Sequence, residues 1–109
     1  VTRLGLNAAK RLFLTAETLE ADELLQIGFL TELVPANELD ARTDALASQI
    51  AANAPLAVAG NKLGLTAIAC GTFDPDAHAV IRKRSAESED HKEAVTAWAE
   101  KRRPVFKGR

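Results

Sequence analysis

The sequence contains no tyrosine and no methionine, and it has only one cysteine and one tryptophan among its 109 residues. A lone Cys70 excludes a disulfide framework or a cluster of metal-binding thiolates within the chain. Aromatic residues are only 5% of the total, so a core must be built from Ala, Leu, Val and Ile. The chain also lacks an apolar run of about 18 residues and a signal-peptide pattern. We therefore expect no membrane span and a cytoplasmic location.

The net charge of −1 hides an uneven distribution of charged side chains. Residues 1–54 carry four basic and eight acidic side chains, whereas residues 55–109 carry ten basic and seven acidic ones. Nucleic-acid-binding domains show a much larger basic excess, so we expect no nucleic-acid partner. A small anionic ligand or an acidic protein surface fits the distribution better. Because the sequence begins with Val1 in mid-pattern, we interpret it as part of a longer protein.

Apolar periodicity predicts six short to medium helices and a mainly α fold. The expected helical ranges are 6–14, 20–27, 37 to about 52, 55–70, 76 to about 87, and 88 to about 103. Residues 29–34 suit a short strand or an extended segment, which would need a partner strand from elsewhere. Residues 55–70 are apolar nearly all round and should be buried on more than one side.

The expected helix ends carry the usual stop and start residues. Gly28 should end the second helix, and Pro104 should stop the last one. Asn37 and Ser88 are suitable N-caps for the third and sixth helices.

Residue types that often carry chemistry have simpler interpretations here. His78 and His91 lie in different predicted helices with no carboxylate cluster at ligand spacing, so we interpret them as surface histidines and expect no metal site. Cys70 ends an apolar helix and suits a buried structural thiol. The carboxylate pairs lie in first helical turns, where the helix dipole and capping explain them; they are Glu20/Glu23 and Glu89/Glu93. The glycines are scattered and form no phosphate-binding loop.

Two basic clusters, residues 82–84 and 101–109, leave two alternatives open. They are either solvated helix ends or anion contacts. On the last predicted helix, Val95, Trp98 and Arg102 recur at spacings of three and four and form one stripe beside Lys101. A large aromatic beside cations fits an anionic ligand with a flat ring, and it equally fits an ordinary docked helix.

Several stretches together resemble the enoyl-CoA hydratase/isomerase (crotonase) family. They occur in the family's order and spacing over essentially the whole chain: G-L-N-A-A-K-R-L-F-L-T at residues 5–15, L-E-A-D-E-L-L-Q-I-G-F-L at 19–30, L-V-P-A-N-E-L at 33–39, A-P-L-A-V at 54–58 with Lys62, S-E-D at 88–90, and A-W-A-E-K-R-R-P-V-F at 97–106. Some positions depart from the family pattern, and the subfamily therefore stays open; they are Ala16 for Gly, Leu24 for Ala, Phe29-Leu30 for Leu-Val, Glu93-Ala94 for Glu-Gly, and Trp98 for Phe.

The resemblance implies an enzyme that polarises an acyl-CoA thioester with two backbone N–H groups, as an oxyanion hole does. In the family those donors and the catalytic carboxylates lie upstream of this stretch, so no catalytic residue is expected in this chain. Residues 1–35 would end the spiral α/β core, and residues 36–109 would form the C-terminal helical region that builds homotrimers or hexamers. The CoA thioester would be the substrate, with no separate cofactor.

By position in the resembling motif, Lys101, Trp98 and Phe106 are the candidates for contact with CoA or the acyl group. Lys101 would offer charge to a CoA phosphate, and Trp98 would supply an apolar wall. Phe106 is a third candidate. The alternative from a different functional class is a non-enzymatic helical module whose apolar faces bind a partner protein.

Overall fold

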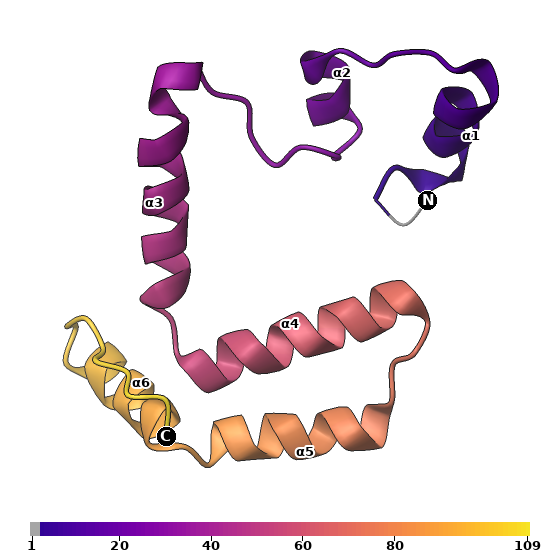
Figure 1. Ribbon diagram of the computed structural model, residues 1–109. Coiled ribbons are helices and arrows are strands. Elements are labelled where there is room, and N and C mark those ends of the chain that lie inside the picture. Colours follow the sequence, from indigo (N-terminus) through magenta and orange to yellow (C-terminus); the bar gives the residue numbers. More distant parts are fainter. Residues whose placement is uncertain (1–2) are drawn as a thin grey trace. The chain divides into compact units, whose positions relative to one another are not determined.

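The computed structural model describes residues 3–109, which are mostly helical (Figure 1). These residues form six α-helices and one short 3₁₀ turn, and the predicted mainly α fold class is therefore confirmed. Among them, no helix is both long and apolar enough to cross a membrane. The chain divides into two compact units, one that ends at Arg42 and one that runs from Thr43 to Arg109. The predicted division near residue 35, between a spiral core and a helical region, stays a prediction.

The first helix, α1, spans Gly5–Thr15 and buries Ala9. Ala16 follows it with a φ of 54°, in the left-handed region that side chains with a Cβ rarely adopt. A glycine, which the resembling motif has at this position, would adopt the same angles without that cost.

The second helix, α2, spans Ala21–Gln26 and begins with a capping box. The Glu20 side chain accepts from the backbone of Glu23, and the Glu23 carboxylate accepts the N–H of Glu20 at 3.3 Å. This geometry confirms that capping explains the first carboxylate pair. Gly28, with a φ of 75°, closes the end of α2 as the sequence predicts.

Residues 29–34 form bends and irregular backbone, and no strand occurs within residues 3–109. A strand is stabilised by hydrogen bonds to a neighbouring strand, and the described chain offers none. The segment is instead bonded to the following helix through Glu32, whose carboxylate accepts hydrogen bonds from Nε of Arg42 at 2.6 Å and from Nη2 of Arg42 at 2.9 Å.

A 3₁₀ turn, Ala36–Glu38, leads into α3, which spans Leu39–Ala51. Asn37 lies inside this turn, so the prediction that Asn37 is the N-cap of the helix is wrong. The turn is closed by the backbone, because the N–H of Glu38 donates to the carbonyl of Pro35 at 2.9 Å.

Two helices of the second unit, α4 (Pro55–Cys70) and α5 (Pro75–Ala86), lie side by side (Figure 1). Two glycines one helical turn apart on α4 permit their close approach. A Cβ on Gly60 would lie 2.9 Å from Ile81 Cγ2, and a Cβ on Gly64 would lie 2.6 Å from His78 Cε1. Because these two glycines have no side chains, α5 packs directly against the backbone of α4 at Gly60 and Gly64.

Most of α4's large apolar side chains are exposed, in contrast to the predicted burial on more than one side. Leu63, Leu65 and Ile68 are each at least 60% exposed, and only Gly60 and Gly64 of this helix are buried. The prediction is wrong for this chain because α5 covers a single face of α4. The exit of α4 at Cys70 is exposed as well, so the expected buried thiol is not observed.

The N-termini of α5 and α6 are capped by side chains. Asp74 accepts from the N–H groups of Asp76 and Ala77 at 2.9 and 3.1 Å and is the N-cap of α5. The last helix, α6, spans Glu89–Ala99 and is capped by Ser88, as predicted.

Candidate functional site

The end of α6 is a Schellman motif, not a helix that continues to the proline. The N–H of Lys101 donates to the carbonyl of Trp98 at 3.2 Å, and the N–H of Arg102 donates to the carbonyl of Ala97 at 3.0 Å. Lys101 has a φ of 56°, in the left-handed region. The helix therefore ends at Ala99, and the prediction that Pro104 stops it is wrong.

The three candidate ligand residues lie at this end of α6 and in the tail that follows, residues 101–109. Trp98 is 84% exposed, which is unusual for the largest apolar side chain of the sequence. Lys101 is also exposed, whereas Phe106 is half-buried. The backbone hydrogen bond between Lys101 and Trp98 places them one turn apart. Their role in ligand binding stays a prediction.

Arg102 does not extend the apolar stripe of α6 as the sequence suggested. Its guanidinium pairs with Glu93, with Nη1 to Oε1 at 2.6 Å and Nη2 to Oε2 at 3.0 Å, and its Nε reaches Glu100 at 2.6 Å. The Glu93 carboxylate also accepts the N–H of Val105 at 2.9 Å. Arg102 first, and then the Val105 N–H, lower the pKa of Glu93 to about 2. The same pairing raises the pKa of Arg102.

Asp90 is a buried carboxylate, with only 2% of its surface exposed. Its two oxygens accept the N–H groups of Lys107 at 2.6 Å and Gly108 at 2.8 Å, and its own N–H donates to the carbonyl of Arg109 at 3.1 Å. Gly108 has a φ of 77°, which favours a residue without a Cβ. The tail therefore returns along α6 and is bonded to it at several points.

The helix dipole and capping, which were expected to explain Glu89/Glu93, do not account for the contacts that Asp90 and Glu93 make with the tail. The available signal was their spacing of three on one predicted helix, which places both carboxylates on one face. The S-E-D motif at residues 88–90 marked Asp90 only as part of a resemblance.

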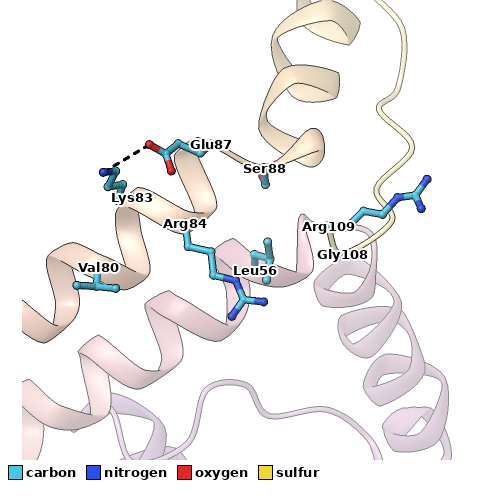
Figure 2. A pocket seen from close by; sticks show the side chains of 8 residues that line it. All are labelled: Leu56, Val80, Lys83, Arg84, Glu87, Ser88, Gly108 and Arg109. Atoms are coloured by element: carbon cyan, nitrogen blue, oxygen red, sulfur yellow. Dashed lines mark ion pairs between the residues drawn. The ribbon is translucent and has the colours of Figure 1, made fainter.

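An open cavity of about 470 Å³ lies between α4, α5 and the tail (Figure 2). Its lining includes Lys83 and Arg84 of the first basic cluster and Arg109 of the second. Lys83 pairs with Glu87 at 3.8 Å. Figure 2 shows Arg84 directed toward Leu56, whereas Arg109 points away. Arg109 pairs with Glu89 at 3.0 Å outside the cavity. The cations do not converge, so this cavity is not a formed anion site, and the three candidate ligand residues do not line it.

The two histidines line the same cavity, which has a volume of about 180 Å³ and lies between α4, α5 and α6. His78 is half-buried against Gly64 and its ring centroid lies 5.2 Å from that of Phe73, so it is a packing residue and not the surface histidine we expected. His91 is exposed. Within residues 3–109, no group of three or more side chains of the metal-binding types comes together.

The profile of the enoyl-CoA hydratase/isomerase family matches residues 1–109. The chain is 36% identical over 105 residues to the short-chain-enoyl-CoA hydratase of Clostridium acetobutylicum, covering 92% of this chain and 39% of that protein. It is 34% identical over 108 residues to the methylmalonyl-CoA decarboxylase of Escherichia coli, covering 95% and 41% of the two chains. The chain thus spans about two-fifths of the length of these relatives.

Solved structures resemble the fold over nearly the whole chain. An enoyl-CoA hydratase/isomerase from Mycobacterium paratuberculosis superposes with a TM-score of 0.82 at 29% identity, over 98% of this chain and 44% of that one. An enoyl-CoA hydratase/carnithine racemase from Magnetospirillum magneticum superposes with a TM-score of 0.85 at 29% identity, over 98% and 40% of the two chains.

Proposed function

The chain belongs to the enoyl-CoA hydratase/isomerase family, and we propose that it is the C-terminal part of an enzyme that acts on acyl-CoA thioesters. In this proposal the chain contributes contacts between identical subunits and part of the acyl-CoA site. The catalytic groups lie elsewhere in the protein, and the CoA thioester is a substrate with no separate cofactor. The order of the resembling motifs, which ends with A-W-A-E-K-R-R-P-V-F at residues 97–106, supports the C-terminal assignment. A cytoplasmic location is part of the proposal.

The observation that carries the ligand role is the backbone conformation of Lys101. It occupies the left-handed position of a Schellman motif, where glycine is the usual residue. A residue with a Cβ costs about 1 kcal/mol or more in that conformation. Such a cost is common at functional sites, where the side chain is needed. An exposed ammonium group held on a tight turn is suited to contact a phosphate.

Trp98 and Phe106 would complete the contact through their apolar surfaces. The exposed indole of Trp98 lies one helical turn before Lys101, so a ligand that reaches the ammonium can also cover the ring. An acyl-CoA offers both chemistries, because it combines phosphates with a flat adenine ring and an acyl chain. Phe106, half-buried in the tail, would be the smaller contributor.

The test is Lys101→Ala in the intact enzyme, with crotonyl-CoA as substrate. We expect KM to rise about tenfold with kcat changed less than about twofold, because a charge-assisted hydrogen bond is lost from binding and the reacting atoms are not touched. Arg103→Ala is the matched control, since it removes an exposed cation from the same tail. A KM unchanged in Lys101→Ala would contradict the ligand role.

The exposed apolar side chains favour one further candidate, a helical module that binds a partner protein without catalysis. Trp98 and Leu65 are examples, with 84% and 68% of their surfaces exposed. Light scattering and crotonyl-CoA titration of the protein discriminate the two. The enzyme is supported if the protein is a trimer or hexamer and if crotonyl-CoA quenches the fluorescence of Trp98. A strict monomer without a fluorescence response supports the binding module.

A further inference from the structure

We propose that Asp90 and Glu93 are positioning residues, which clasp the tail along α6 and hold Lys101 and Phe106 in place for the ligand. This inference deepens the proposed function and rests on it for the role of the ligand. We call the hydrogen bonds of Asp90 and Glu93 to the tail the clasp. They lie within the chain and can be tested separately from ligand binding.

The two carboxylates bond the tail at two successive points. Asp90, in the first turn of α6, accepts the N–H groups of Lys107 and Gly108 at 2.6 and 2.8 Å. Glu93, three residues later on the same face, accepts the N–H of Val105 at 2.9 Å. The tail therefore runs antiparallel to α6, and each point uses an ionised acceptor, which makes roughly twice as strong a bond as a neutral one.

The tail depends on these bonds because residues 103–109 have no regular secondary structure of their own. Ordering an irregular segment costs conformational entropy at every residue, and the clasp offsets that cost. The burial of Asp90 adds to the requirement, since a buried carboxylate needs all its hydrogen-bond partners. Within the described residues, no buried side-chain polar atom lacks a partner, so the clasp is fully bonded.

The anchor points flank the candidate ligand residues in the sequence. Phe106 lies between Val105 and Lys107, the residues whose N–H groups are bonded by Glu93 and Asp90. Lys101 directly precedes Arg102, whose guanidinium is bound by Glu93. The carboxylates thus restrain both ligand residues while their own oxygens are occupied by tail donors. They act through Lys101 and Phe106 and need not touch the ligand.

The test compares Asp90→Asn with Glu89→Gln in the intact enzyme. Each variant removes one negative charge from the first turn of α6, but Glu89 makes only an exposed ion pair with Arg109 at 3.0 Å. We expect hydrogen exchange of the Lys107 and Gly108 amides to become at least about tenfold faster in Asp90→Asn, because an amide cannot accept both N–H groups as an ionised carboxylate does. We expect KM for crotonyl-CoA to rise about fivefold, with kcat within about twofold of its original value. Glu89→Gln should change neither quantity.

A mutant cycle shows whether the effect passes through the two ligand residues. If it does, Asp90→Asn raises KM in the original protein but adds little in a background that carries both Lys101→Ala and Phe106→Ala. An equal rise in both backgrounds overturns the positioning role, and so does faster exchange with an unchanged KM. Unchanged exchange in Asp90→Asn overturns the clasp. A failure of Lys101→Ala alone to raise KM overturns the proposed ligand role, while the exchange result still decides the clasp.

Burial of Asp90 makes Asp90→Asn a demanding substitution, so Glu93→Ala serves as the second variant. Glu93 is partly exposed, and its replacement by alanine removes the acceptor of the Val105 N–H without placing an amide in a buried site. We expect exchange of the Val105 amide to become faster and KM to rise in parallel. Circular dichroism checks that α6 is retained in each variant, and slow Val105 exchange in a folded Glu93→Ala protein overturns the proposal.

Discussion

Gly64 offers the sharpest test of how α4 and α5 pack, through the substitution Gly64→Ala. Two opposing effects determine the result. Alanine is favoured over glycine inside a helix by about 1 kcal/mol. The new Cβ, however, would lie 2.6 Å from Cε1 of His78 and 3.1 Å from its Nδ1, well inside van der Waals contact. Overpacking of this kind costs about 1–3 kcal/mol. We therefore expect a net loss of about 1 kcal/mol in the free energy of unfolding.

The imidazole cannot move away freely, because its other neighbours restrict it. His78 lies on α5, and its ring centroid is 5.2 Å from that of Phe73. If the clash is the cause, removing the imidazole must reverse the sign of the effect. In a His78→Ala background, Gly64→Ala should stabilise the protein by about 1 kcal/mol, which is the helix-propensity term alone.

Urea unfolding followed by circular dichroism at the helix band measures both differences, provided that the slope of free energy against urea stays constant. Gly60→Ala provides a second case, since its Cβ would lie 2.9 Å from Ile81 Cγ2, the methyl group that branches from Cβ. A stabilising Gly64→Ala in the original protein would refute the argument. So would the same destabilisation with and without the imidazole.

Three further predictions concern the helix ends and the tail. Ala16→Gly should stabilise the protein by about 0.5–1 kcal/mol in urea unfolding, because Ala16 has a left-handed φ of 54°; a loss of stability would show that the lost side chain matters more. Lys101→Gly should likewise stabilise the fold, because glycine adopts the left-handed conformation without strain, and it should raise KM for crotonyl-CoA as much as Lys101→Ala does. A stabilised variant with an unchanged KM would contradict the ligand role of Lys101. The pKa of Glu93 is lowered from 4.5 to about 2 in the folded chain, so its contribution to stability is present above pH 4.5 and is lost as the pH falls toward about 2. Glu93→Gln should therefore make the free energy of unfolding depend less on pH between these values. An unaltered acid-unfolding curve would contradict the pairing with Arg102.

The elements that the sequence predicted well are those specified by neighbouring residues. Pro55 begins α4, Ser88 caps α6 and Gly28 closes α2, each because the backbone angles or hydrogen bonds of one residue decide the outcome. Asp74 before Pro75 is the same kind of local signal and marks the start of α5. Trp98 and Lys101 lie one turn apart as their spacing required.

The features that sequence reasoning missed depend on contacts between distant residues. Asp90 meets Lys107 and Gly108 across 17 and 18 positions, and no local pattern specifies such a return of the chain. The end of α6 differs from the prediction for a related reason. Lys101 has good helix propensity but adopts the left-handed conformation, because the Schellman hydrogen bonds and the clasped tail outweigh the preference of one residue.

The error about α4 leads to the same distinction at a larger scale. Its apolar circumference predicted burial on more than one side, whereas the described chain covers one side only. Ala9 and Ala97 are the only apolar side chains buried within residues 3–109, so most of the apolar surface in the sequence does not stabilise this chain internally. Hydrophobic burial is the main favourable term in folding. The subunit contacts that we propose would cover part of this exposed apolar surface, and they would then add to the stability of the chain.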